Sequence, residues 1–252
     1  MNVVTTEAIV LRSYNLAEAD RIVLCFTRSA GLIRGVAKGA RRMKSRFGAA
    51  LEPFTIVRLE FREKENRELV TITGAEIVKS YFDLAADVEC MEGLGYMAEL
   101  VNEFAPPHEA NEKLYRMVAA CLEALAAARH TSKIVVRYFE IWILRLAGSF
   151  PDVSACAVCG TTLTPAQAVF LDFESAARCA DCSRGGGTRL LPQVRQMLLR
   201  TQQLGPAQFA ESSAADFANS DAELAEFTHR LIVRTLERRP RTLGAAGAGP
   251  SA

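Results

Sequence analysis

Four cysteines arranged in two pairs place the strongest constraint on how this chain can fold. Cys156 and Cys159 form one C-x2-C pair, and 19 residues separate it from a second pair, Cys179 and Cys182. Each C-x2-C turn directs two thiolates to one side, and two such turns can complete a tetrahedron around Zn²⁺. We therefore predict one structural zinc ion per chain, since four protein ligands leave no open coordination position for hydrolysis. Free thiols and an iron–sulfur cluster are alternatives that the spacing leaves open.

The remaining sequence favours a reduced, cytoplasmic protein. Cys25, Cys90 and Cys121 lie in apolar or helical contexts, so we predict that they are small core residues. The most apolar long stretch, 134–147, contains three charged residues and is too short for a membrane span. The first residues lack the basic and apolar segments of a secretory signal. Seven cysteines in such a chain favour thiols or metal ligands over a disulfide framework.

Amino-acid composition changes near residue 80. The first 80 residues contain 20 Val, Ile or Thr, whereas the next 70 contain 9. Because β-branched residues favour strands, we predict a β domain over 1–80 followed by a helical region. Its five predicted strands are 3–12, 21–27, 32–37, 53–61 and 69–79. Five short strands suit a small closed barrel of OB type or SH3-like type, since closure removes exposed edges.

Helical patterns dominate the rest of the chain, which makes the predicted fold class α+β. Helices are predicted at 83–105, 109–129, 132–148 and 192–202, and segment 205–219 is predicted to be a loop. Ser220 and Glu223 match a capping box at the start of a last helix. The predicted organisation after residue 80 is a helical domain in two parts, 81–150 and 191–241, a four-cysteine zinc module at 151–190, and a disordered tail at 242–252.

A basic stretch without acidic residues predicts a nucleic-acid interface. Eight basic residues and no Asp or Glu lie between Arg21 and Leu51, while the rest of the chain has a net charge of −7. We call residues 38–46 the basic loop. OB barrels bind single strands with such cationic grooves together with stacking aromatics, for which Tyr14 and Phe47 are candidates, although each also fits simple packing. The alternative for the loop is a flexible, solvated connection. The predicted DNA-binding residues are Arg34, Lys38, Arg41, Arg42, Lys44 and Arg46.

Common catalytic motifs are missing from the sequence. It contains no G-x4-G-K-[ST] phosphate loop, no H-E-x-x-H and no G-x-S-x-G. Its three histidines, His108, His130 and His229, are scattered along the chain. We therefore expect a protein that is not an enzyme, with a metal-dependent nuclease as a further alternative.

Several segments together resemble the bacterial recombination mediator family RecO. The resemblance lies in Glu18–Val23, in Thr27 with Gly31, in Val36–Ser45, in Leu51–Phe54 and in Pro151–Gly160 with the later cysteine pair. It implies an OB fold, a helical domain and a zinc module. It also implies DNA repair by binding single- and double-stranded DNA, annealing strands and loading RecA in the RecF pathway, without nucleotide hydrolysis. The implied partners are RecR, the C-terminal tail of single-stranded DNA-binding protein and, in many bacteria, RecF. A zinc-ribbon RNA-binding or transcription-associated adaptor is the alternative function.

One helical segment is a weaker candidate for binding that acidic partner tail. An acidic, hydrophobic-ended tail needs cations beside apolar residues, and the segment 133–145 combines both. The residues of this hypothesis are Lys133, Arg137, Trp142 and Arg145. The alternative is that the apolar members of this helix simply belong to the core.

Overall fold

The computed structural model describes residues 3–63, 69–165 and 167–243. These residues divide into two compact units, one that ends at Arg129 and one that runs from His130 to Leu243. The predicted helical domain of 81–150 therefore has residues in both units. The predicted tail lies outside the described residues from 244 onward, and Leu243 is buried. Among the described residues, no helix combines the length and the apolar character that a membrane span requires.

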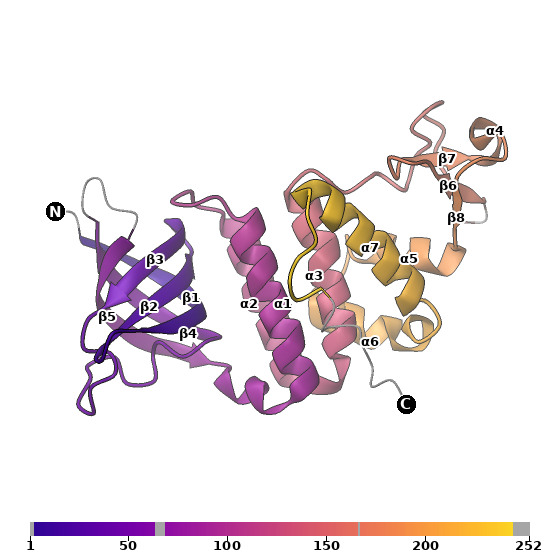
Figure 1. Cartoon of the computed structure of the whole chain (residues 1–252). Coiled ribbons are helices and arrows are strands. Elements are labelled where there is room, and N and C mark those ends of the chain that lie inside the picture. The colour runs from indigo at the N-terminus through magenta and orange to yellow at the C-terminus, as the bar shows by residue number, and fades with distance from the viewer. Residues whose placement is uncertain (1–2, 64–68, 166, 244–252) are drawn as a thin grey trace. The chain divides into compact units, whose positions relative to one another are not determined.

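A closed five-stranded barrel forms the start of the first unit (Figure 1). Its strands are β1 (Val3–Leu16), β2 (Asp20–Thr27), β3 (Gly31–Ala37), β4 (Thr55–Arg62) and β5 (Leu69–Ser80). They close in the order β1-β2-β3-β5-β4, with β3 and β5 parallel and all other neighbours antiparallel. The structure thus confirms a small OB-like barrel at the N-terminus.

The barrel interior is filled by alternate residues of each strand. Val23 pairs with Gly35, which pairs with Val70, and all three face inward. Gly35 is required there, because a Cβ atom at this position would lie 2.6 Å from the Ile72 side chain. Phe47, with its neighbours Ala50 and Leu51, adds to this core from the β3–β4 connection.

Two helices complete the first unit. A short 3-10 turn, η1 (Phe82–Ala86), precedes α1 (Val88–Phe104), and α2 (Glu112–Ala127) follows the segment that contains Pro106 and Pro107. The side chains of Asp87 and Asn111 cap the two helices by accepting from the backbone N–H groups of Cys90 and Leu114.

Helix α2 covers one end of the outer barrel face. The Tyr115 ring lies 6.0 Å from the Phe26 ring of β2, and its hydroxyl donates to Glu7 of β1 at 3.1 Å. Gly31 approaches the backbone of Glu109 so closely that a Cβ atom would lie 2.2 Å from its carbonyl oxygen. Helix α2 and the segment before it are therefore packed against the barrel.

The second unit combines four longer helices with a small sheet. After η2 (Arg129–Thr131), its helices are α3 (Ser132–Leu146), α5 (Pro192–Arg200), α6 (Pro206–Phe217) and α7 (Asp221–Leu236). Helix α3 packs against α6 and α7. The sheet has the order β7-β6-β8, with β6 at Val169–Leu171, β7 at Ala177–Cys179 and β8 at Thr188–Leu190, and the short α4 spans Ala180–Ser183.

Two local predictions in this unit were wrong. The segment 205–219 is not a loop, because α6 occupies most of it and buries Phe209, Ser213 and Phe217 on one face. The predicted capping box does not form either. The Ser220 side chain makes no capping hydrogen bond to a described residue, and Glu223 instead accepts from the backbone N–H of Leu191 at 2.9 Å. Long-range partners therefore replace the local ones that the sequence pattern indicates.

Candidate nucleic-acid interface and metal centre

The six predicted DNA-binding residues are all exposed on the barrel. Arg34 lies on β3, and the other five, Lys38, Arg41, Arg42, Lys44 and Arg46, lie in the basic loop between β3 and β4. None of the six makes an ion pair with a residue that the structure describes. Their positive charge is therefore left uncompensated and open to solvent, which is what phosphate contacts require.

The basic loop is anchored to the turn between β1 and β2. The backbone N–H of Arg41 donates to the Ala19 carbonyl, and its guanidinium donates to the Ala17 carbonyl, both at 2.9 Å. The N–H of Gly39, a residue with a φ of +69°, donates to the Asp20 carboxylate at 2.8 Å. These bonds join the cationic segment to the β1–β2 turn.

The two aromatic candidates differ in exposure. Phe47 is 3% exposed and belongs to the barrel core, with the Arg46 guanidinium 4.9 Å from its ring centroid. It is therefore a packing residue and has no free face for a base. Tyr14, on β1, is 50% exposed.

Two further cations of the acid-free stretch are committed to ion pairs. Arg21 pairs with Glu52 at 2.9 Å, and Arg28 pairs with Glu112 of α2 at 2.6 Å. The Arg28 pair raises the pKa of the guanidinium and lowers the pKa of the Glu112 carboxyl through the hydrogen bond that they share. These two residues support the barrel and its contact with α2.

The strand register adds one cation that the sequence pattern did not reveal. Arg12 of β1 lies opposite Leu24 of β2, which in turn lies opposite Arg34 of β3. Arg12 and Arg34 therefore point to the same outer face of the sheet. Arg12 lies outside the acid-free window, so linear charge counting misses it, and a cross-strand alignment of β1 to β3 is the signal that could have found it.

The four predicted cysteines come together in the second unit. Their sulfur atoms all lie within 4.8 Å of one another, and Cys159 and Cys179 are 3.9 Å apart. The turn of the first pair closes when Gly160, at a φ of +73°, donates to the Cys156 carbonyl at 2.9 Å. The second pair lies at the end of β7 and in α4. Four sulfurs at this spacing form a group that could ligate a metal ion.

The electrostatics of the cluster fit a bound dication. A backbone hydrogen bond from Cys159, with a further one from Cys179, lowers the pKa of Cys156 to about 6. The neighbouring sulfurs of Cys179 and Cys159 raise the pKa of Cys182 to about 12. Cys156 thus ionises readily while Cys182 is held protonated. A dication at the centre would remove this conflict, because thiolates bind the metal in deprotonated form.

The four residues proposed for a partner tail do not form one surface. Lys133 is exposed, but Arg137 is only 4% exposed. The indole N–H of Trp142 donates to the Thr201 carbonyl at 2.9 Å. Arg145 donates to the Thr201 hydroxyl and to the Leu198 carbonyl, with its guanidinium 5.4 Å from the Trp142 ring centroid. Most polar groups of this set are therefore occupied inside the unit.

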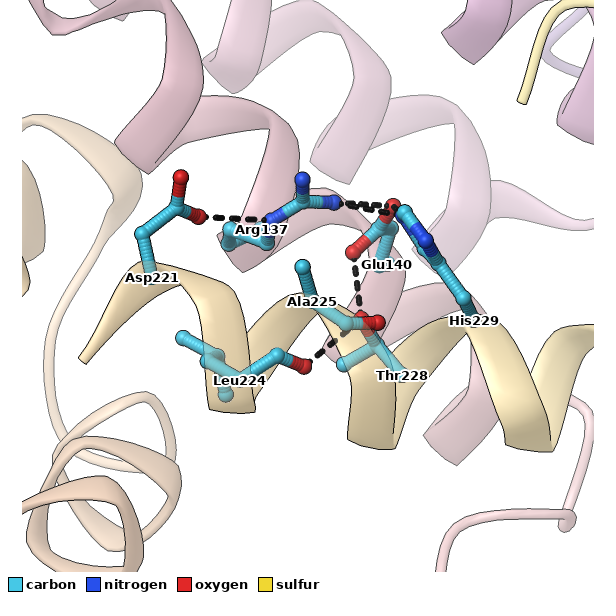
Figure 2. A network of polar contacts seen from close by, with 7 residues as sticks. All are labelled: Arg137, Glu140, Asp221, Leu224, Ala225, Thr228 and His229. Carbon is cyan, nitrogen blue, oxygen red and sulfur yellow. Dashed lines mark hydrogen bonds and ion pairs between the residues drawn. The ribbon is translucent and has the colours of Figure 1, made fainter. Parts of the chain in front are cut away.

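Arg137 belongs to a buried polar network between α3 and α7 (Figure 2). It pairs with the fully buried Glu140 at 2.6 Å and with Asp221 at 3.0 Å. Glu140 also accepts from the Thr228 hydroxyl at 2.6 Å and lies 3.0 Å from His229. Burial alone would raise the pKa of Glu140, but these partners outweigh it and hold the pKa below its ordinary value. The network joins the two helices internally.

Two models of one protein family match most of the chain. The model described as "Recombination protein O N terminal" matches residues 1–81. The model described as "Recombination protein O C terminal" matches residues 86–243. The first match covers the barrel, and the second covers the helices and the four-cysteine cluster.

Known proteins are similar over the same range. A "DNA repair protein RecO" of Anaeromyxobacter sp. (strain K) is 34% identical over 244 residues, which cover 95% of each chain. The protein of the same name from Koribacter versatilis (strain Ellin345) is 36% identical over 190 residues, which cover 75% of this chain and 77% of the relative. One from Bifidobacterium longum (strain NCC 2705) is 40% identical over 162 residues, or 64% and 67% of the two chains.

Proposed function

The chain belongs to the RecO family of DNA repair proteins, and from this premise we propose that it is a recombination mediator without catalytic chemistry of its own. In this role it binds single- and double-stranded DNA, anneals complementary strands and helps to load RecA onto coated single strands. Its proposed partners are RecR, the acidic tail of single-stranded DNA-binding protein and RecF. The proposed site of action is the nucleoid, in the cytoplasm.

The observation that carries the proposal is the exposed, unpaired charge of Arg34 and the basic loop. Two DNA strands repel each other through their phosphates. A cationic surface that holds both strands lowers this barrier by replacing condensed counterions, and this needs no bond making or breaking by the protein. The anchoring of Arg41 to the β1–β2 turn supports this role, because a fixed cationic surface loses less entropy on binding than a free chain.

A zinc ion at the four cysteines is the second part of the proposal. Cys156, Cys159, Cys179 and Cys182 would hold it, and with four sulfur ligands it would be structural. The β6–β8 sheet has three residues in each strand. Metal binding of roughly 10–16 kcal/mol is enough to stabilise so small a module.

For the acidic tail of the partner, Lys133 remains the most accessible candidate on α3, and Trp142 and Arg145 are partly exposed further along the same helix. We leave Arg137 out of this surface, because its guanidinium is buried against Glu140 and Asp221. Binding of a synthetic tail peptide to the Lys133→Glu variant tests this part, and unchanged affinity would argue against it.

Strand annealing tests the main proposal. The triple charge reversal Arg41→Glu, Arg42→Glu and Lys44→Glu is expected to slow annealing of complementary strands and to weaken single-strand binding, with an unchanged circular dichroism spectrum. The assay is run with and without single-stranded DNA-binding protein. Equal annealing by the variant and the wild type would refute the assignment of the basic loop.

The same samples separate the alternative functions. An RNA-binding adaptor requires that structured RNA displaces single-stranded DNA easily and that annealing is absent. A metal-dependent nuclease requires cleavage of labelled DNA in Mg²⁺ or Mn²⁺. We expect neither result.

A further inference from the structure

Tyr14 presents an exposed aromatic ring on the open part of the outer barrel face. Its neighbour Ser13 points inward, with a buried hydroxyl oxygen, so the Tyr14 side chain points outward. In the strand register, Tyr14 lies opposite Ile22 of β2, and Ile22 lies opposite Val36 of β3. Both aliphatic residues are partly exposed. The ring therefore borders a small apolar row that crosses three strands.

Unpaired cations flank this row on the same face. Arg12 is two residues before Tyr14 on β1, and Arg34 is two residues before Val36 on β3, while Lys38 follows directly after the end of β3. Residues two apart on a strand share a face and are separated by about 6.8 Å, and neighbouring strands lie about 4.8 Å apart. The long side chains of these cations can thus reach the surroundings of the ring. None of the three forms an ion pair with another described residue.

The basic loop lies at the same end of the barrel as Tyr14. Arg41 is hydrogen-bonded to Ala17 and Ala19, which lie three and five residues after Tyr14 in the chain. A backbone held by the loop would therefore pass close to the ring. An aromatic ring combined with flanking cations is the arrangement that binds single strands by stacking bases and pairing phosphates.

The other exposed aromatics lack this setting. Phe82, 51% exposed, is followed by Asp83, and Phe173, 89% exposed, lies between Asp172 and Glu174. The arginines near these rings already have their charge balanced, since Arg129 pairs with Asp83 and Arg178 pairs with Asp172. Tyr14, in contrast, has unpaired cations on its own face, and the carboxylate on that face, Asp20 of β2, accepts from the backbone N–H of Gly39.

We infer that Tyr14 is a stacking platform for one unpaired base, and that it gives this chain a preference for single-stranded over double-stranded nucleic acid. The inference rests on the proposed DNA-binding function and assigns a residue to one part of it. Bases in a duplex are already stacked and paired, so they cannot reach the ring without unstacking, which costs free energy. Duplex DNA therefore uses the cations alone, whereas a single strand uses the cations and Tyr14.

The test compares Tyr14→Ala with Tyr14→Phe on the full-length protein, with Phe82→Ala as a matched control for loss of an exposed ring. Affinity is measured for a single-stranded DNA oligonucleotide and for a duplex of the same length, each over a salt series. Stacking of one base is worth about 1–3 kcal/mol, so Tyr14→Ala should weaken single-strand binding by about 5-fold or more. Duplex affinity and both salt slopes should stay unchanged, and Tyr14→Phe should retain most of the affinity.

Each outcome decides between the claims. Equal weakening of single-strand and duplex binding by Tyr14→Ala, or a loss in Tyr14→Phe as large as in Tyr14→Ala, would overturn the stacking role. Unchanged single-strand binding by Tyr14→Ala would also overturn the stacking role. If the charge reversal of Arg41, Arg42 and Lys44 weakens binding strongly in the same assay, the proposed DNA-binding function is still supported. If that reversal also has no effect, the proposed function itself fails.

Discussion

Neutralising three cations of the basic loop, by Lys38→Gln, Arg42→Gln and Lys44→Gln, is expected to halve the salt dependence of single-stranded DNA binding. These three side chains are exposed and make no side-chain hydrogen bond with the rest of the described chain. Arg41 is left intact in this variant, because its guanidinium donates to Ala17, so that each substituted side chain is one that makes no hydrogen bond within the described chain. The variant therefore removes charge with little change to the fold.

The magnitude follows from the number of phosphate contacts. Six exposed, unpaired cations, each replacing counterions on a single strand, give a slope of log affinity against log salt of about −4. Affinity then falls about 300-fold when salt rises from about 50 to 200 mM. With three contacts removed, the slope becomes about −2 and the same change in salt costs about 20-fold.

Fluorescence anisotropy of a labelled oligonucleotide, titrated at several salt concentrations, measures both slopes. The matched control neutralises three exposed cations elsewhere, Lys113 and Arg116 on α2 and Arg230 on α7, and so makes the same change in net charge. An equal loss of slope in the control would show that total charge, and not the basic loop, governs binding. An unchanged slope in the loop variant would refute the assignment of these contacts.

Three other predictions concern metal content and stability. Protein purified without chelators should contain about one zinc per chain by atomic emission, and Cys179→Ser should lower this zinc content. A zinc content below about half an equivalent in the wild type would count against the metal site. Arg137→Met should lower the free energy of unfolding in urea by about 3–5 kcal/mol, since it leaves Glu140 buried without its arginine partner, although Thr228 and His229 remain beside it. Adding Glu140→Leu should recover much of the loss, and a loss under about 1 kcal/mol would mean that the pair is not buried in solution. The folded pKa of Glu140 lies below its ordinary value of 4.5, so its contribution to stability is complete above that pH and is lost as the pH falls through the folded pKa. The wild type should accordingly lose more stability than Glu140→Gln between neutral and acid pH, and parallel stability curves would contradict this.

Local patterns predicted the barrel and the cysteine cluster well. Alternation of buried and exposed residues in β4, such as Val57 and Leu59 inward with Arg58 outward, is imposed by the strand itself and needs no distant partner. The two C-x2-C turns are also local, and Gly160 supplies the positive φ that closes the first of them. Features of this kind are readable because a few neighbouring residues determine them.

Features that depend on residues far away in the chain could not be predicted from the local sequence. Helix α6 is rich in Ala and Ser and resembles a loop in composition, and it becomes evident only when Phe209 and Phe217 find a core to enter. Glu223 has the spacing of a capping residue, yet it bonds to Leu191, 32 residues away. Arg137 is a cation whose burial the sequence does not reveal, because one of its partners, Asp221, lies on another helix.

The proposed nucleic-acid interface lies where one outer face of the barrel changes from apolar to cationic. On the outer face of β1 to β3, the row formed by Ile9, Phe26 and Leu32 is buried, and α2 covers it through Tyr115. Further along the same strands, the outward residues are cationic or aromatic, as at Arg34 and Tyr14. Such side chains can stay in contact with water and need no helix to cover them. The apolar end therefore binds the chain's own helix and the cationic end stays open. The proposed interface is therefore this uncovered end of the β1–β3 face in the described part of the barrel, and substitutions there should affect binding without affecting stability.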